Sequence, residues 1–506
     1  MLHTSLIVEL LRSQPRLMFW VATLAQTALW CVVPSLFYSS PPGELPLVLA
    51  IGHEFQLGSS FGPPLAFWTA EVAFDIAGAP GVYVLAQACI AIAYYGVFTL
   101  ARAVVGIHHA TFAILLMGGI FAFAAPTSDF GPAILALPFT VFAIVNLWRA
   151  VGERRRAGWF LLALQLGLLL LTTYAGLILV FAIFVFLAAT RRGRRALRSA
   201  DPWLASTMIV AVLFPHLIWL DLAADRFPLD FGVATRANGS YLGGFVDFVE
   251  VFMFSHTGLA VLVMLGSKWH FRSEEKVPVF VRSFTDPFGR RFVYFFAVVP
   301  ALIAALFAGL SGEPHTLGNL APYVALSGLA IVVLVGNSIP WYRPRLVAAT
   351  WSLLLAAPAL GVVVAIVVLP WLGVSGANVA QPAAAMGRFF AETFERRTGA
   401  PLAIVAGEPR TAALVALGAP TRPSLYLDAT PERTPWIRAD DIRRKGAVVV
   451  WPNDDTRTQV PADMAMRFPG LVADVPRAFE RTMQGRLPLS RIGWGVLRPQ
   501  ADAPNR

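Results

Sequence analysis

The segment Tyr38–Glu71 reads YSSPPGELPLVLAIGHEFQLGSSFGPPLAFWTAE and separates the first apolar run of the chain from the second. The run before it is long enough to cross a bilayer. Unlike its neighbours, the segment contains several acids, a histidine, aromatic residues and a proline pair, namely Glu44, Glu54, Glu71, His53 and Pro63-Pro64. Acids close to a membrane surface are costly unless they have partners or a task. This segment is therefore the first place to look for chemistry.

The composition indicates a polytopic membrane protein. The chain has 506 residues, of which 57% are hydrophobic and only 14% are charged, against about 25% charged residues in ordinary soluble domains. Its net charge is +10, but the arginines cluster between apolar runs, which is typical of membrane topology and not of nucleic-acid binding. Both cysteines, Cys31 and Cys89, fall in predicted spans, so no disulfide framework or cysteine-rich metal site is expected. The long first apolar run is interpreted as a retained span and not as a cleaved signal peptide.

Apolar runs of membrane length predict about eleven spans. They lie near 17–37, 81–101, 108–126, 132–148, 159–172, 174–190, 203–220, 248–266, 292–311, 320–337 and 346–371. The fifth and sixth are short, and the join at Thr172-Thr173-Tyr174 carries no charge. This stretch is either one long tilted helix or a broken pair that meets inside protein.

The distribution of Lys and Arg predicts the orientation. Basic residues precede spans one, seven, nine and eleven and follow span four, as in Arg154-Arg155-Arg156. All of them fall on one side, which is then cytoplasmic, together with the N-terminus. The acid-bearing loops 38–80, 127–131 and 221–247 lie on the opposite face. We expect a bacterial inner membrane, in which this face is periplasmic.

The chain changes character after Leu372. We predict a transmembrane domain over 1–372, with the outer loop 38–80, and a small extracytoplasmic α/β domain over 373–506. Charges are mixed in this second part, and short pieces alternate between strand-like and helix-like patterns. The candidate strands are Pro401–Ala406, Ser424–Asp428, Ala447–Trp451 and Ile492–Leu497, and the candidate helices are Arg388–Arg397 and Thr411–Leu417.

An ordered set of segments carries a family resemblance. It comprises Gly43-Glu44, HEFQLGSSFGPPLAFW at His53–Trp68, PTSDFGPAILALPF at Pro126–Phe139, WRAVGERRRAGW at Trp148–Trp159, LLLLTTYAGLILV at Leu168–Val180 and FPHLIWL at Phe214–Leu220. In this order they resemble the membrane-embedded glycosyltransferases of the GT-C type, and most closely the bacterial family-39/ArnT-like branch that includes the rhizobial lipid A galacturonosyltransferases. The resemblance covers roughly residues 15–225, and the polar tail is similar in kind.

The resemblance implies a mechanism. The donor is a sugar on a polyprenyl phosphate, the acceptor is a lipid, glycan or protein on the outer face, and an acid early in the first outer loop activates the acceptor or stabilises the reacting centre. The chain departs from the family pattern at three positions. It has Gly43 where the family usually has Asp, Gly62 where a His is common, and Thr173 where a Lys is common.

Two acids are the candidate catalytic residues, because an acceptor hydroxyl must lose its proton as the glycosidic bond forms. Glu44 lies where the family acid is expected, and its alternative role is a solvated acid at a helix start, favoured by the helix dipole. Asp129 lies between spans three and four, where an acid of the family faces the same cavity. Its alternative role is an N-cap of span four.

Six further residues are candidates for substrate binding. His53 and Glu54 lie in a stretch that resembles an interfacial helix, and their alternative role is a cap or surface pair; one His and one Glu are too few ligands to predict a metal. Tyr174 either faces the donor or packs against other helices. His216, late in span seven, either has a functional role or forms a hydrogen bond to a backbone group that Pro215 leaves without its helical partner. Arg226 and Arg236 are available phosphate binders, although contact with lipid headgroups explains them equally well.

No cofactor is predicted, and a divalent metal has no support in the sequence. In the tail, the pairs Asp440-Asp441 and Asp454-Asp455 lack the spacing of a calcium loop, and we interpret them as turns and helix caps. The expected function is transfer of a polyprenyl-phosphate-linked sugar. A transporter or flippase of lipid-linked sugars is the alternative, although no inverted repeat is visible. A non-catalytic member of the family is a third possibility, suggested by the three departures.

Overall fold

A computed structural model describes residues 2–124, 128–223, 241–267, 277–282, 284–311, 317–374, 378–427, 434–453, 458–483 and 485–499. The chain forms two compact units. Unit 1 comprises Met1–Val32, Tyr83–Ile218 and Leu229–Leu360, and unit 2 comprises Val33–Val82, Trp219–Pro228 and Gly361–Arg506.

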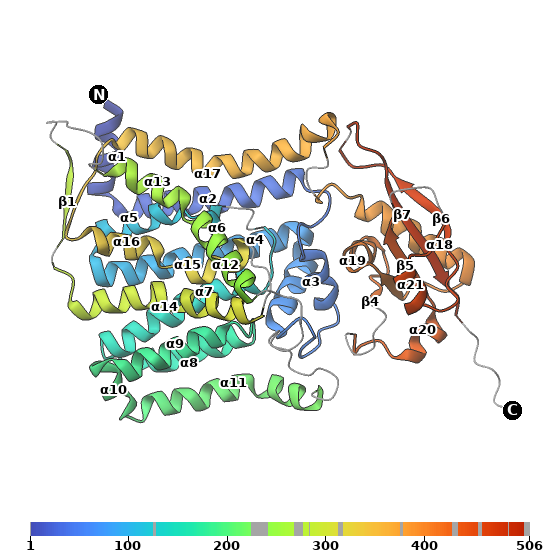
Figure 1. The fold of residues 1–506 in the computed structure, drawn as a ribbon, viewed down its shortest axis with the longest axis horizontal. Helices are drawn as coiled ribbons and strands as arrows, with labels where there is room; N and C mark the ends of the chain where they lie inside the picture. The colour runs from blue at the N-terminus through green and yellow to red at the C-terminus, as the bar shows by residue number, and fades with distance from the viewer. Residues whose placement is uncertain are drawn as a thin grey trace. The chain divides into compact units, whose positions relative to one another are not determined.

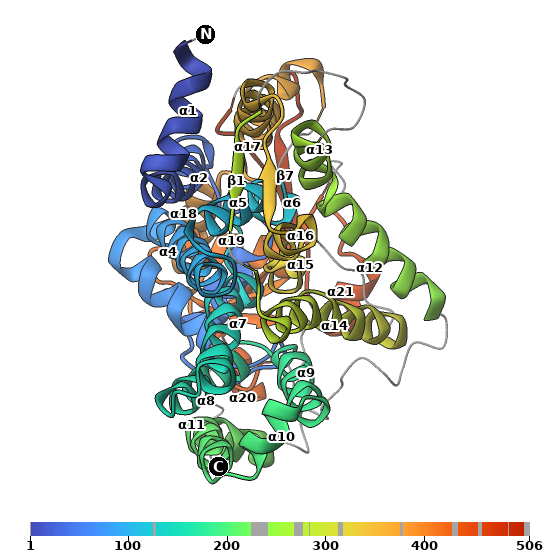
Figure 2. The ribbon, with the colours of Figure 1, turned by 90° about the vertical axis from the view of Figure 1, so that its left-hand side faces the viewer.

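Unit 1 is a bundle of apolar helices, several of which are seen end-on in Figure 2. Its helices, some of which continue into unit 2, are α1 (Leu2–Ser13), α2 (Pro15–Phe37), α4 (Leu65–Val105), α5 (Ile107–Met117), α6 (Phe121–Ala124), α7 (Pro132–Leu147), α8 (Ala157–Leu170), α9 (Gly176–Ala189), α10 (Arg191–Leu197), α11 (Asp201–Ala223), α12 (Tyr241–Ser255), α13 (Thr257–Gly266), α14 (Pro287–Ser311), α15 (Leu317–Val324), α16 (Ser327–Val335) and α17 (Pro344–Val367). Helix α7 continues as a π-helix over Trp148–Gly152. Two short strands, β1 (Val279–Val281) and β2 (Ser338–Pro340), form an antiparallel ribbon that the sequence did not predict.

The helices confirm a multi-pass membrane fold. Among the described residues, seven helices or continuous helix pairs are long and apolar enough to cross a membrane. The remaining predicted spans coincide with α9, which is bent by 103° against α10, and with three shorter apolar helical stretches, so the count of eleven stays a prediction. A turn over residues 171–175 separates α8 from α9, which is the broken pair of the two alternatives; a single long helix there is wrong.

Helix α4 consists of two helical segments that meet at a kink at Ala77 and Gly78, where Gly78 has a positive φ of 62°. Glycine accepts this left-handed conformation without steric cost, and Pro80 follows directly. The second segment agrees with the span predicted from residue 81, whereas the first, which begins at Leu65, was predicted as part of the outer loop. The acids Glu71 and Asp75, which make this stretch resemble a loop, therefore lie on a helix.

Aromatic packing joins the helices of unit 1. The Phe186 ring on α9 contacts four phenylalanines of α14, with ring centroids 5.1 to 5.9 Å apart; these are Phe288, Phe292, Phe295 and Phe296. Trp148 at the end of α7 meets Phe292 edge to face at 5.2 Å. Because lipid tails are as apolar as these side chains, the close fit of packed surfaces holds such helices together.

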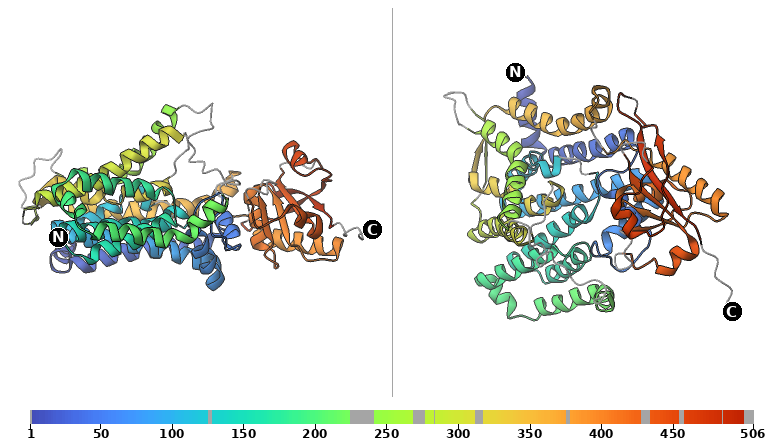
Figure 3. Two further views of the ribbon diagram at one scale, coloured as in Figure 1. Left: turned by 90° about the horizontal axis from the view of Figure 1, so that it is seen from below. Right: turned by 45° about the vertical axis from the view of Figure 1, so that its right-hand side comes forward.

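Unit 2 contains α3 (Leu45–Gly52) and a five-stranded mixed sheet with the order β4-β3-β5-β7-β6. The strands are β3 (Ile404–Gly407), β4 (Ser424–Leu427), β5 (Ala447–Pro452), β6 (Asp474–Phe479) and β7 (Ser490–Leu497), and the helices are α18 (Ala383–Thr398), α19 (Pro409–Gly418), α20 (Ala439–Lys445) and α21 (Ala462–Arg467). The four predicted strands and both predicted helices of the tail are confirmed, whereas β6 was missed. The strands and helices of the tail are orange to red in Figure 3. The fold is therefore the expected mainly helical chain with a small C-terminal α/β region.

Two apolar layers cover the sheet. One face carries Val405, Leu425 and Val448 and packs on Phe390 of α18 and on α19. The other face carries Ile404, Tyr426 and Val449 and packs on α20 and α21 through residues such as Met464 and Phe468. Ala50 of α3 belongs to the first of these cores, with Leu47 and Phe61 packed against it. The first outer loop thus shares a hydrophobic core with the tail.

Substitution of Gly387 by alanine is expected to destabilise unit 2. A Cβ on Gly387 of α18 would lie 2.0 Å from the carbonyl carbon of Gly418 at the end of α19, so two backbones would have to separate. Overpacking of this kind typically costs about 1–3 kcal/mol. The measurement is the thermal unfolding midpoint of the purified protein. Gly361→Ala is the matched control, because a Cβ at this helical position meets nothing within 4 Å, and it is expected to leave the midpoint unchanged or raised.

Candidate functional site

Glu44 is the N-cap residue of α3 and is exposed to solvent. Its carboxylate makes no capping hydrogen bond, and Pro46 occupies the first turn, where a missing N–H costs nothing. Gly43 directly before it has a positive φ of 48°, which turns the chain into the helix. The carboxylate is thus presented at a helix start with no described side chain neutralising it.

The backbone that precedes Glu44 is fixed by the tail residue Arg410. Its guanidinium donates to the carbonyl oxygens of Gly43, Pro41 (3.3 Å) and Asn378 (2.8 Å). The N–H groups of Ser39 and Ser40 donate to the carbonyl oxygen of Val379 at 2.9 and 3.0 Å. These bonds all lie within unit 2, and they hold the start of the outer loop against the segment that leads into the tail.

His53 and Glu71 form the centre of a charged cluster. The Nδ1 atom of His53 lies 2.9 Å from Oε1 of Glu71, and the same oxygen accepts a hydrogen bond of 2.6 Å from Arg422. The Glu71 side chain is fully buried, whereas that of His53 is 40% exposed. The hydrogen bond to Glu71 raises the pKa of His53, outweighing the opposite effects of burial and of the Arg422 charge. This imidazole therefore stays protonated to higher pH than a free histidine.

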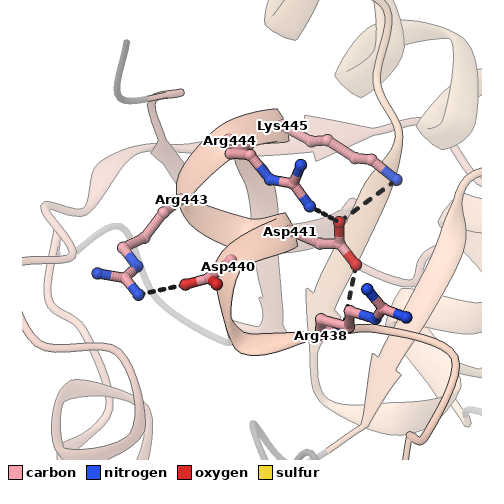
Figure 4. Close-up of polar contacts among 6 residues, drawn as sticks. All are labelled: Arg438, Asp440, Asp441, Arg443, Arg444 and Lys445. Atoms are coloured by element: carbon pink, nitrogen blue, oxygen red, sulfur yellow. Dashed lines mark hydrogen bonds and ion pairs between the residues drawn. The ribbon is translucent and has the colours of Figure 1, made fainter. Parts of the chain in front are cut away.

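Glu54 lies beside this cluster. Burial raises the pKa of Glu54, and a hydrogen bond from Ser424 and the charges of His53 and Lys445 oppose that rise. Lys445 closes α20, and its Nζ atom lies 3.8 Å from the carboxylate of Asp441, which also pairs with Arg444 (Figure 4). Asp441 accepts from the backbone N–H of Arg438 at 3.0 Å, so it is the predicted helix cap. Its partner in the sequence pattern, Asp440, pairs with Arg443 on the surface.

Two members of the cluster were not predicted. Glu71 was noted only as an acid of the outer loop. A charged residue inside the apolar stretch AFWTAEVAF, at positions 66–74, could have indicated that it is buried and paired. Arg422 gives no such signal, since it lies in a polar turn that is 351 residues away from Glu71 along the chain.

Asp129 lies in unit 1, in the turn that leads into α7. The N-cap of α7 is Gly131, so the capping role considered for Asp129 is wrong. Its neighbours Ser128 and Phe130 are fully buried, while Asp129 itself is partly exposed. Asp129 thus lies in the turn before α7, and its contact with a substrate stays a prediction.

Tyr174 and His216 lie together in unit 1. The Tyr174 hydroxyl is 3.0 Å from Nε2 of His216, and the two rings are stacked with centroids 5.9 Å apart. Tyr174 comes from the turn between α8 and α9, and His216 is a buried residue of α11. The sequence named both residues but not their contact. Arg226 and Arg236 lie outside the described residues. Within the described ranges, no group of three or more His, Cys, Asp or Glu side chains is arranged to hold a metal ion.

The chain was compared with known proteins. Residues 62–219 match the family model described as dolichyl-phosphate-mannose-protein mannosyltransferase. The structure is similar to the crystal structure of ArnT from Cupriavidus metallidurans bound to undecaprenyl phosphate, with a TM-score of 0.57 and 13% identity over 96% of this chain and 99% of ArnT. The apo oligosaccharyltransferase of Archaeoglobus fulgidus gives a TM-score of 0.46 and 13% identity over 87% of this chain and 69% of that protein. The search of curated proteins found no significant match.

These findings bear on the fold and on the resemblance read from the sequence. The matched segment 62–219 contains Asp129, Tyr174 and His216, together with the loop end that includes Pro63-Pro64. The ArnT-like fold extends over nearly the whole chain, including the tail. The predicted resemblance to GT-C-type membrane glycosyltransferases is confirmed.

Proposed function

We propose that this chain transfers a sugar from a polyprenyl-phosphate donor to a lipid, glycan or protein acceptor at the periplasmic face of a bacterial inner membrane. The observation that carries this proposal is the match of residues 62–219 to a family of glycosyltransferases that use a lipid-phosphate sugar. The likeness in fold to a structure that holds undecaprenyl phosphate supports the same class of donor. The clustering of arginines between spans supports a cytoplasmic N-terminus and a periplasmic tail over residues 373–506.

Glu44 and Asp129 are proposed as the acids of the reaction. Transfer requires that the acceptor hydroxyl lose its proton, and a carboxylate within hydrogen-bond reach accepts it. Glu44 is suited to this role because it is exposed and its backbone is fixed by Arg410. The N-cap of α7 is Gly131, and in this proposal Asp129 binds the donor or the acceptor.

The leaving phosphate needs cations or hydrogen-bond donors. Arg226 and Arg236 are proposed to contact it, and the Tyr174–His216 pair offers a hydroxyl and an imidazole on the donor side. His53 and Glu54 remain proposed substrate contacts in the outer loop. Because the chain departs from the family pattern at Gly43, Gly62 and Thr173, we propose that these groups supply the charge that the usual side chains provide.

A deletion strain tests the proposed function. The lipid A, glycan and free-lipid profiles of the deletion strain and its parent are compared by mass spectrometry. Loss of one discrete sugar mass, restored by the wild-type gene, is expected and would identify the transferred sugar and its acceptor. An unchanged profile, with the protein present in the parent membrane, would contradict a transferase and favour transport of lipid-linked sugars.

A further inference from the structure

The charged cluster of His53, Glu71 and Arg422 joins three parts of unit 2. His53 follows α3, Glu71 lies on α4, and Arg422 lies between α19 and β4 in the tail. A single carboxylate oxygen of Glu71 accepts from both other residues, at 2.9 and 2.6 Å. The second oxygen is buried without a hydrogen-bond partner among the described residues. All the polar contacts of this buried acid are therefore concentrated on one atom.

The backbone at the cluster is strained in two places. Arg422 has a φ of 45° and Phe55, two residues after His53, has a φ of 46°. Residues other than glycine seldom adopt this left-handed conformation, and it persists only where the surroundings fix it. The guanidinium of Arg422 also lies over the Phe74 ring, 4.8 Å from its centroid. The tail thus holds Arg422 in one place, from which it fixes Glu71.

The cluster orients the imidazole of His53. A buried carboxylate is costly unless it is paired, and Arg422 already supplies that pairing. The hydrogen bond between Nδ1 of His53 and Glu71 fixes the orientation of the imidazole ring. The other ring nitrogen, Nε2, has no partner among the described residues, and the side chain is 40% exposed. When His53 is protonated, Nε2–H is a charged donor available to an anionic group.

We propose that His53 contacts the phosphate of the lipid-linked donor through Nε2–H, and that Glu71 and Arg422 are positioning residues that hold its imidazolium in place. This inference rests on the proposed function, because the phosphate belongs to the proposed donor. It assigns a role to the tail, which supplies through Arg422 one part of the outer-loop site. It also distinguishes Glu71 from Glu44, since Glu71 acts through His53 and Glu44 acts on the acceptor.

The charges around His53 determine how the contact depends on pH. Glu71 on α4 raises the pKa of His53 most, and the neighbouring Glu54 also raises it. Arg422 from the tail lowers it, as does burial, and Lys445 of α20 acts on Glu54. Together these influences raise the pKa of His53. The contact is therefore fully formed below the ordinary histidine range and is lost as the pH rises through the raised value.

The test is binding of undecaprenyl phosphate to the purified full-length protein in detergent, measured from about pH 5.5 to 9. Below the raised pKa, His53→Gln is expected to weaken binding by about tenfold to a hundredfold, the usual worth of a charged hydrogen bond. The phosphate monoester of the probe itself titrates near pH 6, so its affinity changes with pH even without a contact to His53. The pH profile of His53→Gln measures this change and is the baseline for the wild type. Wild-type affinity is expected to fall with rising pH relative to that baseline.

Two positioning variants are expected to shift this fall in opposite directions. Glu71→Gln removes the influence that raises the pKa of His53, so the fall moves to lower pH. Arg422→Gln removes a positive charge that lowers the pKa, so the fall moves to higher pH. General damage to unit 2 would move both variants the same way, and that result, or a Glu71→Gln profile identical to wild type, would overturn the inference.

Two controls separate the possible sources of an effect. Arg397→Gln breaks another Arg–carboxylate pair of unit 2, with Asp474, and is expected to leave the pH profile unchanged. Inorganic phosphate is expected to displace the probe from wild type and much less effectively from His53→Gln; equal displacement from both would contradict a phosphate contact. If wild type fails to bind the probe at all, the proposed donor itself is wrong, whereas binding that is independent of His53 overturns this inference alone.

Discussion

Glu71→Ala is expected to lower the free energy of unfolding of unit 2 by about 3 kcal/mol. Removing one partner of a buried ion pair leaves the other as an uncompensated charge, which is far more costly than losing a pair on the surface. Glu71 is fully buried, and Arg422, whose side chain is only 21% exposed, would lose its carboxylate. His53 would lose its orienting bond in the same step. Two groups are therefore left unpaired by a single substitution.

The measurement is the thermal unfolding midpoint of the purified protein, followed together with protease resistance of the tail. Asp474→Ala is the matched control, because it breaks an Arg–carboxylate pair whose side chains are 37% and 28% exposed. Exposed pairs contribute at most about 1 kcal/mol. A control midpoint that falls as far as that of Glu71→Ala would show that burial of Glu71 is not what makes its pair matter.

Glu44→Gln is expected to reduce sugar transfer by about 10²–10⁴-fold, which is the usual contribution of general acid–base catalysis. Glutamine keeps the size and hydrogen-bonding capacity of the side chain but does not accept the acceptor proton. Because Glu44 makes no capping bond to α3, the substitution is expected to leave folding and membrane insertion unchanged. Asp129→Asn is expected to give a loss of the same order, for the substrate contact proposed there.

The measurement is the transfer rate in membranes that contain equal amounts of each variant. Asp75→Asn is the matched control, because Asp75 is an exposed acid of the predicted outer loop 38–80 for which we propose no contact with substrate. It is expected to retain full activity. Full activity in both Glu44→Gln and Asp129→Asn would remove these two residues from the catalytic site and leave the fold assignment untouched.

Local patterns predicted most of the elements. Apolar runs predicted where the helices of unit 1 lie, and strand-like pieces such as Ala447–Trp451 predicted four of the five strands of the tail sheet. The strand β6 was missed because Pro476 interrupts its pattern. Proline is tolerated in a strand at the edge of a sheet, and β6 is the edge strand next to β7. The helical segment of α4 before its kink was missed because it carries two acids, Glu71 and Asp75.

The sequence predicted individual residues of the candidate site but not the contacts between residues that are distant along the chain. His53, Glu54 and Glu44 stood out as polar residues beside a membrane span, and the structure places all three in unit 2. The pairing of Glu71 with Arg422 has no local pattern, because no periodicity links two residues that far apart in the chain. The contact between Tyr174 and His216 was missed for the same reason, although each residue was named. Arg226 and Arg236 lie outside the described residues and stay predictions.

The distance along the chain between Glu71 and Arg422 also sets an order of events during synthesis. A ribosome that adds about 5–20 residues per second needs roughly 20 to 70 seconds to make the 351 residues that separate them. For most of that interval the outer loop is already made, but the helices α18 and α19, which share its hydrophobic core, are not. The core of the loop is therefore completed late, although the loop is among the first segments made. A chain that stops before Arg422 carries all of its predicted spans and an unfinished site.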